Sequence, residues 1–172
     1  IRIKCGDATR SRGGAALTNA STQFVDFNVL SYYNRRPKVQ QTSLTANRSI
    51  TSTTYVELNS EIRNTYIIWT DDAADIRGSL SVQGELNIAT YAALGHDSTT
   101  VAGNIAQRMY HPTNNDYFPS VLCETKTGVT ETASHYVTVL GAVSSGTGVF
   151  FGDAAGVAPA DQKCTLDVTV MG

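Results

Sequence analysis

The segment Tyr136-Val137-Thr138-Val139-Leu140 decides the fold class of this chain. Its aromatic and β-branched residues are those that a pleated, half-buried strand favours. The pattern recurs in Ser79-Leu80-Ser81-Val82-Gln83 and in Leu166-Asp167-Val168-Thr169-Val170, where apolar and polar residues alternate. Alternation with a period of two predicts strands that have one buried side and one side facing solvent.

Further strands are expected along most of the chain. They cover residues 24–30, 53–58, 66–70, 101–110, 120–123 and 148–151, with an ambiguous segment at 86–94. Turn-forming residues separate them at 71–75, 95–98, 111–116, 144–148 and 156–162. About nine or ten short strands at this spacing indicate an all-β fold, an antiparallel jelly-roll sandwich. The alanines within residues 92–107 leave room for one short helix.

The composition is that of one β-rich domain. The chain has 172 residues, of which 41% are hydrophobic and 16% are charged, and it contains 22 Thr and 14 Ser. This low charge excludes a coiled coil and a charge-rich disordered tail. No apolar run reaches the roughly 18 residues of a membrane span, so no membrane partner is expected. The chain starts at Ile1 without Met, and we expect further residues before it in the complete protein.

The amino-terminal part is basic and the remainder is acidic. Residues 1–48 contain eight of the thirteen Lys and Arg and two of the fifteen Asp and Glu, so they carry +6 and the rest carries −8. We expect an extended arm over residues 1–22, followed by a single sandwich domain over residues 23–172. The basic residues are candidates to contact either nucleic-acid phosphates or the acidic surface of a neighbouring copy, and the second interpretation is favoured. They are Arg2, Lys4, Arg10, Arg12, Arg35, Arg36 and Lys38.

Three cysteines stand apart in the sequence. Cys5, Cys123 and Cys164 include no C-x-x-C pair, so a zinc site is not expected. A buried free thiol is the favoured interpretation for such residues. If a disulfide forms, Cys5 and Cys164 are its candidates, because that bond would join the two ends of the chain.

The residue types of catalytic sites do not fall into a catalytic pattern. His96, His111 and His135 have no spacing that places them beside a nucleophile, and Ser144 and Ser145 lack the G-x-S-x-G elbow. We therefore expect no enzyme.

One acidic segment is a weak candidate for a calcium site. Asp71, Asp72 and Asp75, with Thr70, offer the oxygen ligands that calcium prefers, although a solvated acidic turn is favoured. No other cofactor is expected.

Several segments resemble the C1q/TNF-like jelly-roll domains of phage and other virion structural proteins and of trimeric extracellular proteins. They are residues 52–58, 94–100, 128–139, 148–152 and 166–170, and the resemblance covers residues 39–172. It implies a ten-strand sandwich that trimerises, carries no catalytic residues, and acts by binding or by building a particle.

A second resemblance is to the coat proteins of small icosahedral viruses, in which a basic arm faces the genome. Both resemblances imply a self-assembling virion protein that contacts copies of itself as a trimer or larger assembly, other virion proteins, and, through the arm, nucleic acid. The alternative is a secreted, extracellular glycan-binding adhesin. In that class the sugar site would use aromatic and polar residues such as Trp69, Tyr110, Asn114 and Tyr117.

Overall fold

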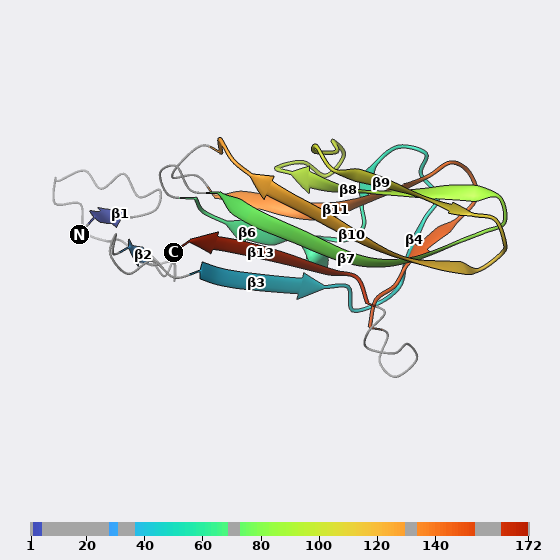
Figure 1. Ribbon diagram of the computed structural model, residues 1–172, viewed down its shortest axis with the longest axis horizontal. Helices are drawn as coiled ribbons and strands as arrows, with labels where there is room; N and C mark the ends of the chain where they lie inside the picture. Colours follow the sequence, from blue (N-terminus) through green and yellow to red (C-terminus); the bar gives the residue numbers. More distant parts are fainter. Residues whose placement is uncertain are drawn as a thin grey trace, which may run out of the picture.

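The computed structural model describes residues 2–4, 28–30, 37–68, 73–129, 134–153 and 163–171, and the regular secondary structure within these ranges is β-strand apart from one 3-10 turn (Figure 1). The strands are β1 (Arg2–Lys4), β2 (Asn28–Leu30), β3 (Pro37–Ser43), β4 (Arg48–Ile50), β5 (Val56–Glu57), β6 (Asn64–Tyr66), β7 (Ala74–Gly84), β8 (Ile88–His96), β9 (Ala106–His111), β10 (Asp116–Lys126), β11 (His135–Val143), β12 (Gly148–Phe150) and β13 (Thr165–Met171). One 3-10 turn, η1, covers Ser60–Ile62. The predicted all-β fold is confirmed.

Two antiparallel sheets pack face to face as a sandwich. The six-stranded sheet has the order β3-β13-β7-β12-β4, and β10 pairs with the other edge of β7. The five-stranded sheet has the order β5-β11-β8-β9, and β6 also pairs with β11. Most connections between consecutive strands lead from one sheet to the other. One layer of the sandwich contains β3, β13, β7 and β10, and the opposite layer contains β6, β11, β8 and β9. This connectivity is that of a jelly roll.

Strand β7 shows why the sequence folds in this way. Its residues alternate between buried and exposed from Ala74 to Gly84, with Ile76, Leu80 and Val82 on the inner side. The central strand of a sandwich needs this pattern, because one side meets the opposite sheet and the other meets solvent. The inner side chains of both sheets form one core, in which the largest fully buried apolar residues are Leu44, Ile62, Val82, Leu94, Leu122, Val137, Val139, Phe150 and Leu166.

Backbone hydrogen bonds join two turns at one end of the sandwich. In the β7–β8 turn, Asn87 has φ 60° and its N–H donates to the carbonyl of His111 at 2.8 Å. In the β9–β10 turn, Asn115 has φ 66° and its N–H donates to the carbonyl of Gly84 at 3.1 Å. Asparagine tolerates this left-handed region better than most residues. The two turns therefore fix the ends of four strands from both sheets.

Some local expectations are wrong. Residues 92–107 contain no helix, because the alanines of β8 are small buried strand residues and Ala92 and Ala93 are fully covered. Asp75 belongs to β7 and not to a turn, because the β7 ladder starts at Ala74. The strand expected at 66–70 ends at Tyr66 within the described residues. Strands β3 and β4 were not expected.

The first two strands form a small sheet of their own. Arg2–Lys4 pairs antiparallel with Asn28–Leu30, and Ile3 is opposite Val29. The other residues of the expected arm lie outside the described part of the chain, so its boundary at residue 22 stays a prediction. No helix in the described part is long and apolar enough to cross a bilayer.

Candidate functional site

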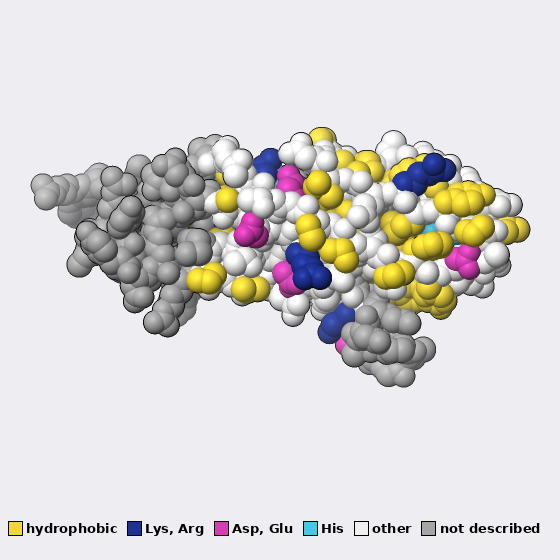
Figure 2. Space-filling view, viewed as in Figure 1, with side chains coloured by type: hydrophobic (Ala, Val, Ile, Leu, Met, Phe, Trp, Pro, Cys, Tyr) yellow, Lys and Arg dark blue, Asp and Glu magenta, His cyan; other side chains and the backbone are white. Residues whose placement is uncertain are grey.

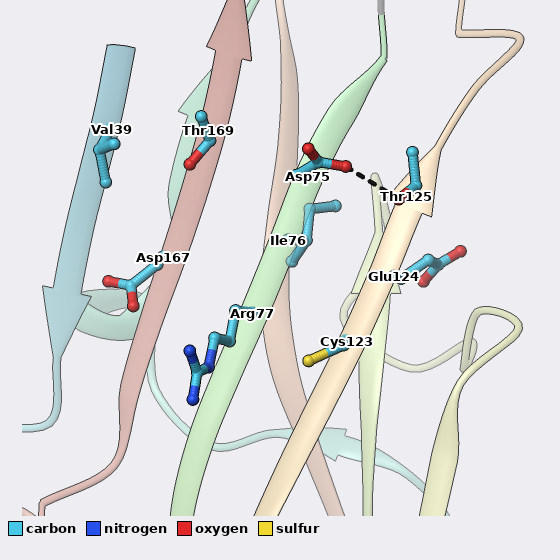
Figure 3. A pocket seen from close by; sticks show the side chains of 9 residues that line it. All are labelled: Val39, Asp75, Ile76, Arg77, Cys123, Glu124, Thr125, Asp167 and Thr169. Carbon is cyan, nitrogen blue, oxygen red and sulfur yellow. Dashed lines mark hydrogen bonds between the residues drawn. The ribbon is translucent and has the colours of Figure 1, made fainter. Parts of the chain in front are cut away.

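The outer face of the six-stranded sheet contains a shallow hollow of about 480 Å³ (Figure 3). It spans four neighbouring strands, β3, β13, β7 and β10. Its lining residues are Val39, Asp75, Ile76, Arg77, Cys123, Glu124, Thr125, Asp167 and Thr169. We call the solvent-facing residues Val39, Gln41, Asp75, Arg77, Cys123, Thr125, Asp167 and Thr169 the outer face.

Strand register arranges the outer face in two rows. Asp167, Arg77 and Cys123 are partners across β13, β7 and β10. Thr169, Asp75 and Thr125 form the next row along the strands. Within this row the Thr125 hydroxyl donates to Asp75 Oδ1 at 2.8 Å (Figure 3). Because partners in register project to the same side of a sheet, these side chains share one surface.

The charges of the outer face lack ion-pair partners within the described residues. Two arginines elsewhere are paired, Arg48 at 2.8 Å from Glu61 and Arg63 at 2.6 Å from Glu57, whereas Arg108 on β9 makes no ion pair within the described residues. Arg77 is exposed and makes no such pair, and Asp167 Oδ1 is buried without a hydrogen-bond donor. Glu124 contributes little charge to the hollow, because its carboxylate turns away from it toward His96 (Figure 3). An unpaired cation and an unpaired carboxylate therefore lie side by side.

This arrangement is suited to polar recognition. An exposed guanidinium presents several donors in a fixed plane, and the half-buried Asp167 carboxylate is a charged acceptor. The remaining outer-face groups are the Asp75 carboxylate, two threonine hydroxyls, one amide, one valine and the exposed Cys123 thiol. Figure 2 shows this side of the molecule, on which basic and acidic side chains lie among many uncharged ones. Three of the eight outer-face residues are charged, and both signs of charge are present, which suits contact with a surface of complementary charge.

The three histidines are placed apart. His111 is buried between the sheets, with Nε2 at 2.9 Å from the Thr90 hydroxyl and Nδ1 at 3.2 Å from the carbonyl of Asp116. His96 Nε2 lies 2.9 Å from Glu124 Oε2, a nearly buried pair that joins β8 to β10 across the two sheets. His135 Nδ1 lies 2.7 Å from Asp97 Oδ2.

Near these histidine pairs, the pKa of Asp97 is lowered and the pKa of Tyr66 is raised. Burial alone would raise the pKa of Asp97, but hydrogen bonds from His135 and from the Tyr136 N–H outweigh it and lower this pKa. Burial raises the pKa of Tyr66 to about 12, and the nearby Asp97 and Glu124 carboxylates add to the effect. Ser144 has a different partner: its hydroxyl accepts a hydrogen bond from the Ala89 N–H.

Most of the predicted basic contacts lie outside the described side chains. Arg10, Arg12, Arg35 and Arg36 are outside the described residues, and Arg2 and Lys4 belong to β1. Lys38 is exposed on β3. A role of this set in binding a second copy or nucleic acid stays a prediction.

The predicted calcium site is described only at Asp75, because Asp71 and Asp72 lie outside the described residues. In the described part of the chain no three His, Cys, Asp or Glu residues form a group able to hold a metal. Calcium binding by the full set stays a prediction.

The predicted disulfide is described only at Cys164. This thiol is buried, with Sγ 3.5 Å from the carbonyl oxygen of Ser81, and burial raises its pKa to about 11. Cys5 lies outside the described residues, so its pairing with Cys164 stays a prediction.

The aromatic residues proposed for a sugar site are partly fixed in place. Tyr110 is 48% exposed and its hydroxyl donates to Asn87 Oδ1 at 3.1 Å. Tyr117 is 54% exposed and stacks on Phe151, with ring centroids 5.2 Å apart. Asn114 is exposed in the β9–β10 turn, and Trp69 lies outside the described residues.

The outer face could not have been found from the sequence by motif. Asp167 lies about ninety residues after Asp75 and Arg77, and only the insertion of β13 between β3 and β7 brings them together. The alternating pattern of residues 166–170 identified the polar side of the strand. It did not identify which strand would lie beside it.

Comparison with known proteins gives matches in structure and none in sequence. No family model and no curated protein sequence matches the chain. The fold is similar to the VP2 subviral particle of infectious bursal disease virus, with a TM-score of 0.44 and 12% identity over 79% of this chain and 40% of that one. Two further structures, of the Gx strain and of the T13 particle of the same virus, give TM-scores of 0.43 and 0.39 at 13% identity. The chain spans well under half the length of these proteins.

Proposed function

We propose that this chain is a structural subunit of a virion and that it acts through contacts between copies of itself. The single observation that carries the proposal is the outer face, a polar sheet surface whose oppositely charged Arg77 and Asp167 have no ion-pair partner in the described residues. Jelly rolls serve as building blocks of viral shells, and a sheet surface of this composition suits repeated symmetric contacts.

The number of copies in the assembly decides which kind of virion subunit the chain is. A capsid decoration, fibre or tail component would form a closed trimer or similar small assembly. A major coat protein would form particles of dozens of copies, with the basic residues of positions 1–36 facing the genome. The C1q/TNF-like resemblance favours the first form and the charge of the arm favours the second.

Native mass measured by light scattering tests the proposal and separates these forms. The purified full chain is measured at low and high salt, and the ratio of absorbance at about 260 and 280 nm reports bound nucleic acid. A salt-resistant trimer of about three times the chain mass supports a fibre or decoration component. Large particles that contain nucleic acid support a coat protein. A chain that stays monomeric at every salt and protein concentration overturns the proposal.

One specific observation favours a second candidate, a glycan-binding adhesin. The exposed rings of Tyr110 and Tyr117 are each held by a neighbour, Asn87 and Phe151 respectively. Fixed aromatic faces beside amides can stack on sugar rings at low entropic cost. Binding to immobilised glycans that is lost in Tyr110→Ala and Tyr117→Ala, by a chain that stays monomeric, would support this candidate.

A further inference from the structure

We infer that the outer face binds the outer face of a second copy across a two-fold axis that runs along the strands, between β13 and β7. This inference rests on the proposed function of self-assembly and names the surface and residues that make one of its contacts. Two-fold contacts are isologous, so the same patch must be complementary to itself.

Strand register makes the outer face self-complementary. Asp167 on β13 and Arg77 on β7 are direct cross-strand partners at the same level along the sheet. A two-fold axis between these strands places β13 of one copy over β7 of the other. Arg77 of each copy then lies over Asp167 of the other, and Thr169 lies over Asp75. The contact contains two identical pairs of opposite charge.

The unpaired groups of the outer face are those that the second copy would satisfy. Asp167 Oδ1 is buried and accepts no hydrogen bond, and Arg77 makes no ion pair within the described residues. A buried acceptor without a donor costs free energy. A guanidinium is the side chain best suited to donate hydrogen bonds to a carboxylate. The hollow of about 480 Å³ provides room for the arginine of the other copy. Both signs of charge on one patch favour a second copy over a partner of uniform charge.

The edge of the same sheet is less suited to pairing than its face. Strand β10 is an edge strand, and such edges can bind another strand through their free backbone groups. Pro119 in β10 has no N–H, and the carbonyl of Val121 already accepts a hydrogen bond from Gln107 Nε2 at 2.8 Å. A contact through side chains of the face avoids both obstacles.

Charge reversal and charge exchange test the contact in the full chain. We expect Arg77→Glu to lower the native mass by half or more at micromolar concentration, because two carboxylates would then face each other in each pair. Asp167→Arg should have the same effect. The double variant Arg77→Asp, Asp167→Arg should restore the wild-type mass, because the exchanged charges pair again. Arg108→Glu is the matched control, since Arg108 is also an exposed strand arginine but belongs to β9 of the other sheet.

Cys123 gives a second measurement at the same contact. It is exposed in the single chain and lies in register with Arg77, so the second copy would cover it. Alkylation of the Cys123 peptide, followed by mass spectrometry, should be about tenfold or more slower in the assembled wild type than in Arg77→Glu. Circular dichroism of every variant verifies that the sandwich is folded.

The outcomes separate this inference from the proposed function. If the wild type assembles, but Arg77→Glu keeps its mass and Cys123 reacts equally fast in both, the inference is wrong and assembly uses another surface. If the double variant stays dissociated while both single variants and the double variant are folded, the Arg77–Asp167 pairing is wrong. If the wild type never assembles, both proposals fail.

Discussion

The imidazole of His111 packs directly against the backbone of Gly84, so closely that a β-carbon at position 84 would overlap the ring. Phe118 covers the same ring edge-to-face, with centroids 5.1 Å apart and planes at 81°. His111 belongs to the five-stranded sheet and Gly84 to the six-stranded sheet. The absence of a side chain at position 84 therefore sets how closely the two sheets approach at this end.

Gly84→Ala should destabilise the sandwich by about 1–3 kcal/mol, because the added methyl must displace a fully buried ring. Urea denaturation followed by circular dichroism measures the change. Gly78→Ala on the same strand is the control, since a β-carbon there would meet Leu122 at an ordinary 3.6 Å. Equal stability of the two variants would contradict this account of Gly84.

His111 should make the protein less stable in mild acid. Burial lowers the pKa of His111 below its ordinary value of 6.5, so the folded state holds the ring neutral and the unfolded state binds the proton first. The contribution of the neutral ring is therefore complete above the unfolded pKa and is lost as the pH falls below it. Unfolding free energies measured between about pH 7.5 and about pH 5 should decrease less in His111→Gln than in the wild type. An unchanged slope would contradict the prediction.

Asn64 should contribute strongly to stability, because its side chain connects the two sheets through hydrogen bonds. It is fully buried, and its Nδ2 donates to the carbonyls of Leu166 at 2.7 Å and Gln40 at 3.3 Å. Asn64→Leu keeps the branched shape of the side chain but puts two methyl groups in place of the smaller amide. It leaves both carbonyls without this donor, which should cost about 1–3 kcal/mol. Thermal and urea unfolding measure the loss. Asn114→Ala, in an exposed turn, is the comparison and should change stability by no more than about 0.5 kcal/mol.

The Cys164 thiol should resist alkylation in the folded protein. Burial raises its pKa to about 11, and the thiolate is the reactive form. Iodoacetamide at about pH 8 should leave the Cys164 peptide unmodified until urea unfolds the chain. Mass spectrometry of that peptide before and after unfolding is the measurement, and rapid modification of the folded protein would rule out a buried thiol.

Removal of residues 1–22 should leave the sandwich folded and weaken assembly. The described strands of both sandwich sheets begin at Pro37, whereas residues 2–4 pair, among the described residues, with 28–30 alone. Circular dichroism should retain its β signal, and light scattering should report a lower native mass at the same concentration. Loss of the β signal would show instead that these residues belong to the folded domain.

The sequence predicted strands best where one side of the strand is buried. Residues 79–83 alternate, and they lie within β7. Strand β3 was missed because Pro37, Lys38 and Gln40 give it no apolar period, and its first five residues are all exposed. The prediction of a helix within residues 92–107 is wrong. Alanine is a strong helix former, but it also fits in buried strands such as β8, where neighbouring chain segments leave little space.

The candidate site depends on tertiary contacts that local patterns do not contain. Arg77 could be recognised from sequence as a polar residue of a strand, but its row with Asp167 and Cys123 follows from the pairing of three strands. The distribution of charged residues along the sequence instead predicted a contact through the basic amino-terminal part of the chain. Side-chain pairing in the folded state decides which charges remain unpaired, and Arg48 and Arg63 are neutralised by nearby glutamates.

The insertion of β13 between β3 and β7 also has a consequence for synthesis. Asp167 lies on the last described strand, so a nascent chain carries Arg77 long before the ribosome has made its acidic neighbour. Nascent chains that emerge side by side on one messenger RNA therefore contain Arg77 but not yet Asp167. In the proposed contact, pairing between copies is thereby delayed until β13 has been made, which protects shorter nascent chains from premature association.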